Sequence, residues 1–142
     1  MTECECFSED FLLARYEHWR LQPSKQQGFL GWCLVILSRH AEDAAELTPE
    51  EVVELWEIVR RARAALVGLF QPDHFNYAIL GNVLRHVHLH VMPRYESARE
   101  FAGRTFRDEH WGWFAIPGRE EAPPDVLEAL ATALRGELAK EG

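Results

Sequence analysis

Short segments of this chain, rich in apolar residues and bounded by turn residues, are typical of β-strands, and we predict strands at residues 17–22, 29–37, 75–80 and 86–92. The first two flank the polar turn at residues 23–28 and are expected to form a hairpin. In the last segment Val87, Leu89 and Val91 alternate with three histidines, and Pro93 is expected to close it. Because successive side chains of a strand point to opposite faces, the apolar residues should face the core and the histidines the other side.

A longer segment has helical periodicity and a clear beginning. Thr48-Pro49-Glu50-Glu51 combines a capping box with a proline in the first turn, and this pattern is typical of a helix start. Pro72 marks the end, since proline cannot continue a helix and disfavours helical geometry at the residue before it. The apolar face of this helix is expected to consist of Val52, Trp56, Val59, Leu66 and Phe70.

Two further helices are predicted towards the ends of the chain, a short one at residues 8–16 and a longer one at about residues 124–140. The intervening sequence after Tyr95 is irregular and rich in aromatic residues, most of which are expected to pack. No repeat, linker or change of composition divides the chain. We therefore expect a single α+β domain over residues 1–142, in which the long helix covers one face of an antiparallel sheet.

Composition and charge narrow the class of protein. The chain has 142 residues, 47% apolar and 27% charged, which suits one folded domain of ordinary size. Its formal net charge of -8 argues against binding to duplex nucleic acid. No apolar run approaches the roughly 20 residues that span a bilayer. The N-terminus has neither the basic nor the apolar region of a signal peptide, so we expect a cytoplasmic protein without membrane contact.

The cysteines allow two different interpretations. Three of them are too few for a disulfide framework, and Cys33, inside an apolar run, is expected to be a core residue. Cys4 and Cys6 leave open a zinc site completed by histidines, although their spacing is shorter than the usual two-residue gap.

The three alternating histidines, His86, His88 and His90, carry the candidate chemistry of this chain. A buried imidazole needs partners for both ring nitrogens, so a purely structural role for all three would require an extensive polar network. Two chemical roles are left: neutral nitrogens binding a metal ion, or one histidine acting as a nucleophile. Ligation of one ion by all three is strained, because His86 and His90 should lie roughly 13 Å apart along a strand.

Residues 86–92 fit the pattern His-φ-His-φ-His-φ-φ, where φ is apolar, and thereby resemble the signature of the histidine triad superfamily. The surrounding sequence is similar to a bacterial branch of that superfamily at Asn76-Tyr77-Ala78, Gly81-Asn82 and Pro93-Arg94-Tyr95. The resemblance implies a mostly antiparallel five-stranded sheet with one long helix and terminal helices. It also implies a homodimer.

The same resemblance implies a nucleotide hydrolase or transferase that attacks the α-phosphate of a nucleoside phosphate ester, anhydride or amidate. Diadenosine polyphosphates and nucleoside phosphoramidates belong to this class, and the expected partner is a purine nucleotide or dinucleotide. By position, His88 is the nucleophile and forms a covalent nucleotidyl-histidine. His86 and His90 are expected to orient the phosphate and to carry positive charge or protons.

Three other polar residues follow from the resemblance as substrate-binding candidates. Asn76 matches an asparagine that contacts phosphate or sugar, Asn82 lies in the loop that enters the triad strand, and His40 is expected to support the site. The nucleobase is expected near Leu21 and Phe29 in the first hairpin. No metal ligand and no obligatory cofactor are implied, with a divalent cation only as the companion of a polyphosphate substrate.

This chain departs from the family pattern at two positions. Many members read Gly-His-φ-φ-φ-φ-Pro where this chain has Trp32 in place of the histidine and Leu37 in place of the proline. Trp32 is expected to stack or pack against the site. The loss of an auxiliary histidine keeps two alternatives open, a nucleotide-binding module without useful catalysis and a metal-binding protein.

Four basic residues lie near the triad in the sequence, namely Lys25, Arg39, Arg85 and Arg94. They are candidates for a local basic pocket or for solvated surface charges. Solvation is the favoured reading for Lys25 and Arg39.

Overall fold

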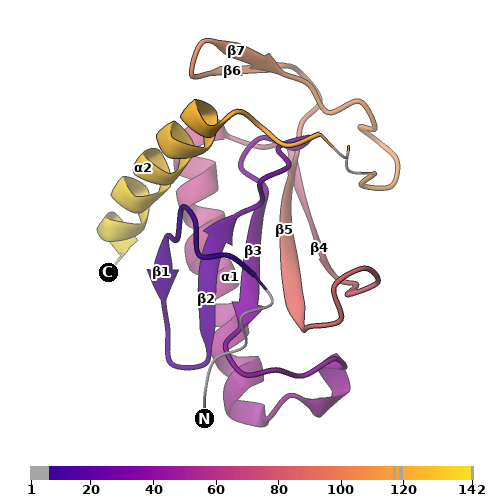
Figure 1. Cartoon of the computed structure of the whole chain (residues 1–142). Helices are drawn as coiled ribbons and strands as arrows, with labels where there is room; N and C mark the ends of the chain where they lie inside the picture. Colours follow the sequence, from indigo (N-terminus) through magenta and orange to yellow (C-terminus); the bar gives the residue numbers. More distant parts are fainter. Residues whose placement is uncertain (1–6, 117, 119, 142) are drawn as a thin grey trace.

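The computed structural model describes residues 7–116, 118 and 120–141. In this part of the chain, five strands form one antiparallel sheet in the order β1-β2-β3-β5-β4 (Figure 1). Their bounds are Ala14–Arg15 for β1, Trp19–Pro23 for β2, Cys33–Leu37 for β3, His74–Ile79 for β4 and His88–Arg94 for β5. The α+β class, the five-stranded sheet and the first hairpin are thus confirmed.

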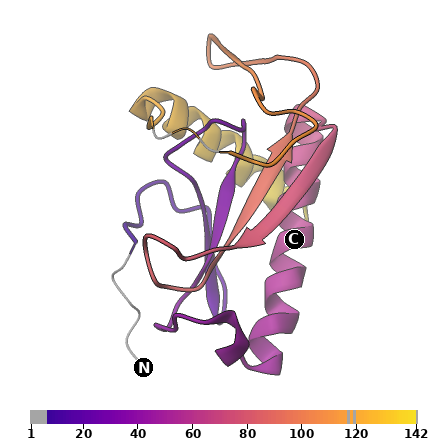
Figure 2. The same ribbon diagram turned by 90° about the vertical axis from the view of Figure 1, so that its right-hand side faces the viewer.

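Helix α1, Pro49–Phe70, runs along one face of the sheet, and α2, Pro124–Glu141, packs against α1 (Figures 1 and 2). A short 3-10 helix, Ala44–Glu46, precedes α1. Buried apolar side chains from both helices and one sheet face form the main core, including Leu21, Val35, Leu89, Leu66 and Leu130. None of the described helices is long and apolar enough to cross a bilayer.

The predicted start of α1 is confirmed at the level of hydrogen bonds. Thr48 Oγ1 accepts a hydrogen bond from the Glu51 amide, and Glu51 Oε1 accepts one from the Thr48 amide at 2.8 Å. Arg39 donates to both carboxylate oxygens of Glu51 at 2.7 and 2.9 Å, so its favoured interpretation as a solvated surface charge was wrong. This contact holds the pKa of Glu51 down at about 2.

The predicted apolar face of α1 was wrong in its first two turns. Val52 and Trp56 are exposed, whereas Leu55, Ile58 and Ala62 are buried in the core. In these turns the buried positions begin one residue earlier than predicted, at Glu51, whose carboxylate is held by the capping box and Arg39.

The predicted helix at residues 8–16 was also wrong. Phe11 has a left-handed backbone with φ of 65°, and the short strand β1 pairs with β2 through Ala14 and Arg15. Side chains of β2 hold the preceding backbone, because Arg20 donates to the Phe7 carbonyl and Gln22 to the Ser8 carbonyl. These tertiary contacts override the local helical pattern.

The strand bounds differ from prediction by one or two residues at each end of β2, β4 and β5 and by more in β3. Residues 29–32 lie outside β3, and His86 lies outside β5. Strand β5 continues through Pro93 to Arg94, although Pro93 was expected to close it. Beyond Val91 the β3 partner has ended, so only β4 still pairs with β5, and proline is tolerated on a strand with one open side.

The region after Tyr95, expected to be irregular, contains a further hairpin. Strand β6, Arg99–Phe101, pairs with β7, Arg104–Phe106. Ala102 and Gly103 form its two-residue turn with φ of 51° and 74°, the two positive values that a type I′ turn requires. Alanine is unusual at the first of these positions, which is why the sequence did not indicate a turn here.

Candidate functional site

The sheet face opposite α1 carries the triad. The strand register places His88 beside Ile36 and His90 between Leu34 and Ala78, while Val87, Leu89 and Val91 are buried in the core. The predicted division of the alternating segment between the two faces is therefore confirmed. His86 lies two residues before the start of β5 and is also buried.

The ring of His88 is held in one tautomer. Its Nδ1 lies 2.6 Å from the backbone carbonyl oxygen of His86. Because a carbonyl oxygen can only accept, Nδ1 carries the proton and Nε2 keeps its lone pair. Burial lowers the pKa of His88, which favours this neutral form. A neutral imidazole with a fixed tautomer has the electronic state that a nitrogen nucleophile needs.

His86 is fixed by different partners. Its Nε2 donates to the Leu37 carbonyl at 2.6 Å, and its Nδ1 lies 3.1 Å from Nδ1 of His40. Since Nε2 of His86 carries the proton, the neutral ring accepts from His40 at Nδ1. Burial lowers the pKa of His86. His40 thus touches the triad through His86, as expected for a supporting residue.

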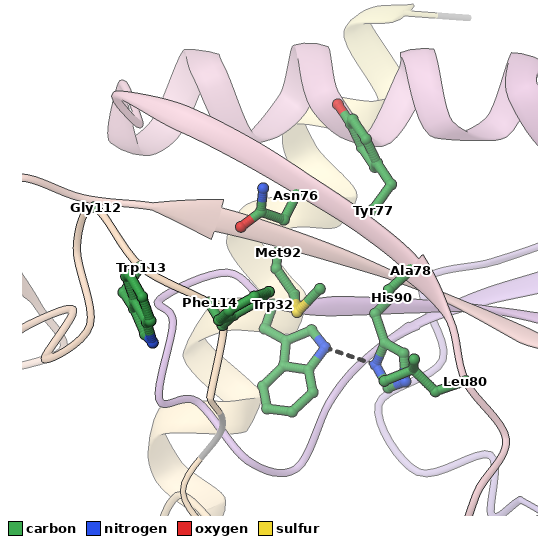
Figure 3. A pocket seen from close by; sticks show the side chains of 11 residues that line it. Trp32, Asn76, Tyr77, Ala78, Leu80, His90, Met92, Gly112, Trp113 and Phe114 are labelled. Atoms are coloured by element: carbon green, nitrogen blue, oxygen red, sulfur yellow. Dashed lines mark hydrogen bonds between the residues drawn. The ribbon is translucent and has the colours of Figure 1, made fainter.

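His90 is bound by the residue at which this chain departs from the family pattern. Trp32 Nε1 donates to Nδ1 of His90 at 3.1 Å (Figure 3). An indole N–H can only donate, so the proton of neutral His90 lies on Nε2. Burial, together with His88, lowers the pKa of His90 to about 4. Neutral His90 therefore presents an N–H donor at Nε2 and carries no positive charge.

The two asparagine candidates lie in different places. Asn76, on β4, borders the same cavity as His90, and its Oδ1 accepts from Arg94 at 2.6 Å. Asn82 is exposed and lines a separate cavity with Asp43 and Arg85. The structure therefore brings Asn76, but not Asn82, to the cavity of His90.

Arg94 has a structural role that the sequence analysis did not assign. It is buried, and its five N–H groups donate to Asp108, Asn76 and the carbonyls of His110 and Trp113. This uses the full donor capacity of a guanidinium group. Arg94 thereby ties the aromatic segment at residues 108–113 to the sheet. Arg94 and Asp108 are 14 residues apart, and no helix or strand periodicity relates the two positions, so the sequence did not indicate their contact.

A cavity of about 650 Å³ opens on the histidine face between β4, β5 and this aromatic segment (Figure 3). Its lining is mainly apolar and includes Trp32, Met92, Trp113 and Phe114, with His90 and Asn76 as polar residues. Trp113 and Phe114 are largely exposed, at 68% and 73%. An apolar recess with few polar groups is the usual form of a small-molecule site.

Leu21 and Phe29, near which the nucleobase was expected, are both buried and do not line the cavity, although Phe29 packs beside Trp32 and Met92, which do. Leu21 points into the main core, and its neighbours Arg20 and Gln22 face the histidine side, since adjacent strand residues alternate. Phe7 covers this side, with its ring centroid 4.9 Å from that of His88. The described structure thus has the triad between Phe7 and the aromatic cavity.

Metal binding was left open by the sequence. Among the described residues, no three His, Cys, Asp or Glu side chains are grouped so that they could hold a metal ion. Cys4 and Cys6 lie outside the described residues. Cys33 is buried in the core as predicted, and burial raises its pKa to about 12.

Comparisons with known proteins agree with the geometry. An uncharacterised HIT-like protein of Mycoplasma genitalium is 32% identical over 76 residues, which are 50% of this chain and 54% of that protein. The match thus spans about half the length of this curated relative.

Two solved structures share the fold. A hypothetical histidine triad nucleotide-binding protein of Sulfolobus tokodaii has a TM-score of 0.71 at 19% identity, covering 92% of this chain and 84% of that one. A diadenosine triphosphate hydrolase of Plasmodium falciparum has a TM-score of 0.68 at 13% identity, covering 95% and 80%. The HIT domain model matches residues 21–97, which include the whole triad and three of the five sheet strands that hold it. With this match, the sequence signature and the five-stranded fold in agreement, the chain belongs to the HIT domain family.

Proposed function

We propose that this protein is a nucleotide hydrolase or transferase in which His88 attacks the α-phosphate of a nucleoside phosphate ester, anhydride or amidate. The observation that carries the proposal is the 2.6 Å contact between His88 Nδ1 and the His86 carbonyl. It leaves the lone pair of Nε2 available for attack on phosphorus. The named activity of the structurally similar diadenosine triphosphate hydrolase is consistent with this reaction class.

The neighbouring residues have distinct roles in this proposal. His90, as an N–H donor 4.9 Å from His88 between ring centroids, hydrogen-bonds the phosphate or the departing atom. Asn76 binds phosphate or sugar, with its amide oriented by Arg94. His86, supported by His40, positions His88. Asn82 contacts substrate from the loop after β4. The step through a nucleotidyl-histidine needs no metal ion.

We extend the proposal to the setting of the enzyme. The whole chain, residues 1–142, acts as one catalytic domain on a purine nucleotide or dinucleotide in the cytoplasm. Strand β4 lies at one end of the sheet, next to exposed apolar residues of α1, and this surface suits a homodimer.

A specific observation favours a second candidate function, a nucleotide-binding module without useful turnover. Phe7 makes a T-shaped contact with the His88 ring, and the Trp32 indole N–H donates to Nδ1 of His90. Such a module would bind the same ligands but would form no covalent intermediate.

Intact-protein mass spectrometry separates the two functions. Wild-type protein and His88→Ala are mixed briefly with a panel of adenosine and guanosine dinucleotides and phosphoramidates. We expect a transient mass gain of one nucleoside monophosphate on the wild type and none on His88→Ala. The exposed His74, varied as His74→Ala, serves as the matched control and should keep the adduct. Binding without adduct or released monophosphate in the wild type would favour the binding module instead.

A further inference from the structure

The histidines of the triad supply no positive charge to a phosphate. His86, His88 and His90 are held as neutral rings, and burial lowers the pKa of all three. Arg94 lies nearby, but all five of its N–H groups are bound to protein acceptors. A phosphate at His88 would lose water without gaining a cationic partner from these four residues. The charge has to come from another residue on the histidine face.

Arg20 is a buried cation on this face of the sheet. It lies on β2 and is 2% exposed. Arg20 pairs with Ile36, and Ile36 pairs with His88, so the side chains of Arg20 and His88 share one face with roughly 10 Å between their Cα atoms. Burial lowers the pKa of His86, and the positive charge of Arg20 adds to this effect. The guanidinium group of Arg20 therefore acts electrostatically on the triad.

Residues 7–9 lie between this guanidinium group and the triad. Nη2 of Arg20 donates to the Phe7 carbonyl at 3.2 Å, and Nη1 lies 3.9 Å from Oε1 of Glu9. The Phe7 ring contacts the ring of His88, with 4.9 Å between the ring centroids. One short segment thus places oxygen acceptors and a negative charge on the guanidinium group and a flat ring on the imidazole. A nucleotide would bring the same kinds of groups to this side of the triad.

The fit of residues 7–9 to this position is incomplete. The side chain of Glu9 is 42% exposed, and its carboxylate also pairs with Arg15. Nε2 of Gln22 donates to the Ser8 carbonyl at 2.8 Å, whereas the buried Oε1 of Gln22 has no hydrogen-bond partner among the described residues. A buried acceptor without a donor costs free energy. A nucleotide, which carries hydroxyl donors as well as phosphate oxygens, suits such a surface better.

A hinge follows this segment in the chain. Phe11 has a φ of 65°, in the left-handed region that bulky residues rarely adopt, and strained residues of this kind are found at switch regions. Two contacts reach across it or lie beside it, a 3.2 Å bond from the Leu12 amide to the Glu9 carbonyl and the exposed pair of Asp10 with Lys25. Exposed pairs contribute little. Since the sheet begins only at β1, rotation at Phe11 can move residues 7–9 without disturbing the sheet.

Resting on the function proposed above, we propose that Arg20 is the phosphate-binding cation of the site and that residues 7–9 are an internal occupant of the same position. A nucleotide displaces this segment at the hinge. The guanidinium group then exchanges the Phe7 carbonyl and the Glu9 carboxylate for two oxygens of the α-phosphate, a bidentate and charge-assisted contact. Arg20 offsets the negative charge on these oxygens while His88 attacks phosphorus.

The first test compares nucleotides with nucleosides in equilibrium dialysis, because only the former carry a phosphate. The probes are adenosine and guanosine 5′-monophosphate and the two corresponding nucleosides. Arg20→Met removes the charge and should weaken monophosphate binding at least about tenfold, while nucleoside binding changes by less than about twofold. Arg20→Lys keeps a positive charge and should recover part of the monophosphate affinity. Thermal unfolding of each variant checks that the fold is retained.

The second test removes the internal occupant and does not depend on a buried substitution. Glu9→Gln eliminates the competing carboxylate, and Phe7→Ala eliminates the ring on His88. Each should strengthen monophosphate binding by about two- to fivefold, because a larger fraction of the protein is then open to ligand. Glu100→Gln makes the same change of charge at an exposed residue of β6 and should leave the affinity unchanged.

The outcomes separate this inference from the proposed function, since monophosphate binding requires no turnover. Equal losses of nucleoside and monophosphate affinity in Arg20→Met would overturn the inference alone. So would weaker monophosphate binding in Phe7→Ala, which would make residues 7–9 a wall of the site, or equal gains in Glu9→Gln and Glu100→Gln. Binding of monophosphate that depends on Arg20, without a histidine adduct in the mass spectrometry described above, would support the phosphate site and overturn the hydrolase or transferase function. A wild-type protein that binds neither monophosphate would overturn both.

Discussion

Each imidazole of the triad owes its tautomer to its own set of hydrogen-bond partners. A backbone carbonyl fixes His88, a carbonyl and a second histidine fix His86, and an indole N–H fixes His90. These four partners leave a lone pair on His88 next to a donor on His90. The site is thus set for nucleophilic attack before substrate arrives, and this arrangement depends on all three rings remaining neutral.

Neutral buried histidines make stability depend on pH, and we predict that the free energy of unfolding falls below about pH 6.5. The pKa of His90 drops from 6.5 in its exposed form to about 4 in the fold, and those of His86 and His88 are also lowered. Below the unfolded pKa, the unfolded chain binds more protons than the native one, so acid favours unfolding. Urea unfolding at pH values from about 7.5 to about 5 measures this decline.

A His90→Gln variant tests the origin of that decline, because it should show a shallower loss of stability over the same pH range. The carboxylate of Glu51, with its pKa lowered to about 2 from 4.5, contributes stability that is lost only at lower pH. Protonation of Glu51 therefore does not contribute to the decline in stability between about pH 7.5 and about pH 5. Equal declines in wild type and His90→Gln would contradict the contribution assigned to His90.

At the residue level, the sequence predicted features formed by nearby residues but not contacts between residues far apart in the chain. The alternation of His86, His88 and His90 is local, so the face they share could be read from the sequence. The bond between Trp32 and His90 joins residues 58 positions apart, and that between Arg94 and Asp108 joins positions without a shared periodicity. Such contacts depend on which strands become neighbours, which a single sequence does not specify.

At the scale of elements, the aromatic segment beside the cavity is held by one buried ion pair. Arg94 and Asp108 have side-chain exposures of 3% and 0%. Asp108 also accepts hydrogen bonds from the amides of Tyr95 and His110. We predict that Asp108→Ala destabilises the protein by about 3 kcal/mol, because it leaves a buried guanidinium without its counter-charge.

Urea unfolding measures this loss, and hydrogen exchange of residues 108–115 should show faster opening of the segment. Asp10, whose exposed carboxylate pairs with Lys25, is the matched control. Asp10→Ala should change the free energy of unfolding by less than about 1 kcal/mol, as is usual for exposed pairs. A similar loss in both variants would show that the buried pair has no special role.

An element could be predicted from the sequence where residues within the element itself determine its conformation. The capping box and proline at the start of α1 act within a few residues, and the helix begins where they predict. The segment at residues 8–16 carries a comparable helical pattern, but β2 pairs with it and binds its backbone instead. Helix α1 has a self-sufficient start, whereas the N-terminal segment takes its conformation from the sheet.

At the scale of the whole molecule, the sheet ends are unequal. Strand β1 has two residues, whereas β4 has six and presents an open edge in the described chain. Next to this edge lies an apolar patch, which we define as Val53, Trp56, Tyr77 and Ile79, with exposures of 61%, 43%, 36% and 38%. The rings of Trp56 and Tyr77 are 6.1 Å apart, so the patch is continuous from α1 to β4. An open edge and an apolar patch on one side favour self-association.

We predict that the protein is a dimer in solution through this patch, with twice the 16.4 kDa mass of the chain by light scattering during size-exclusion chromatography. Val53→Glu places a carboxylate at the centre of a surface that would be desolvated on pairing, and should weaken dimerisation at least about tenfold. Val83→Glu adds the same charge at an apolar residue that is 100% exposed outside the patch, and should leave the dimer intact. A wild-type protein that stays monomeric at all concentrations would contradict the prediction, and equal weakening by both variants would argue for a charge effect instead of a defined interface.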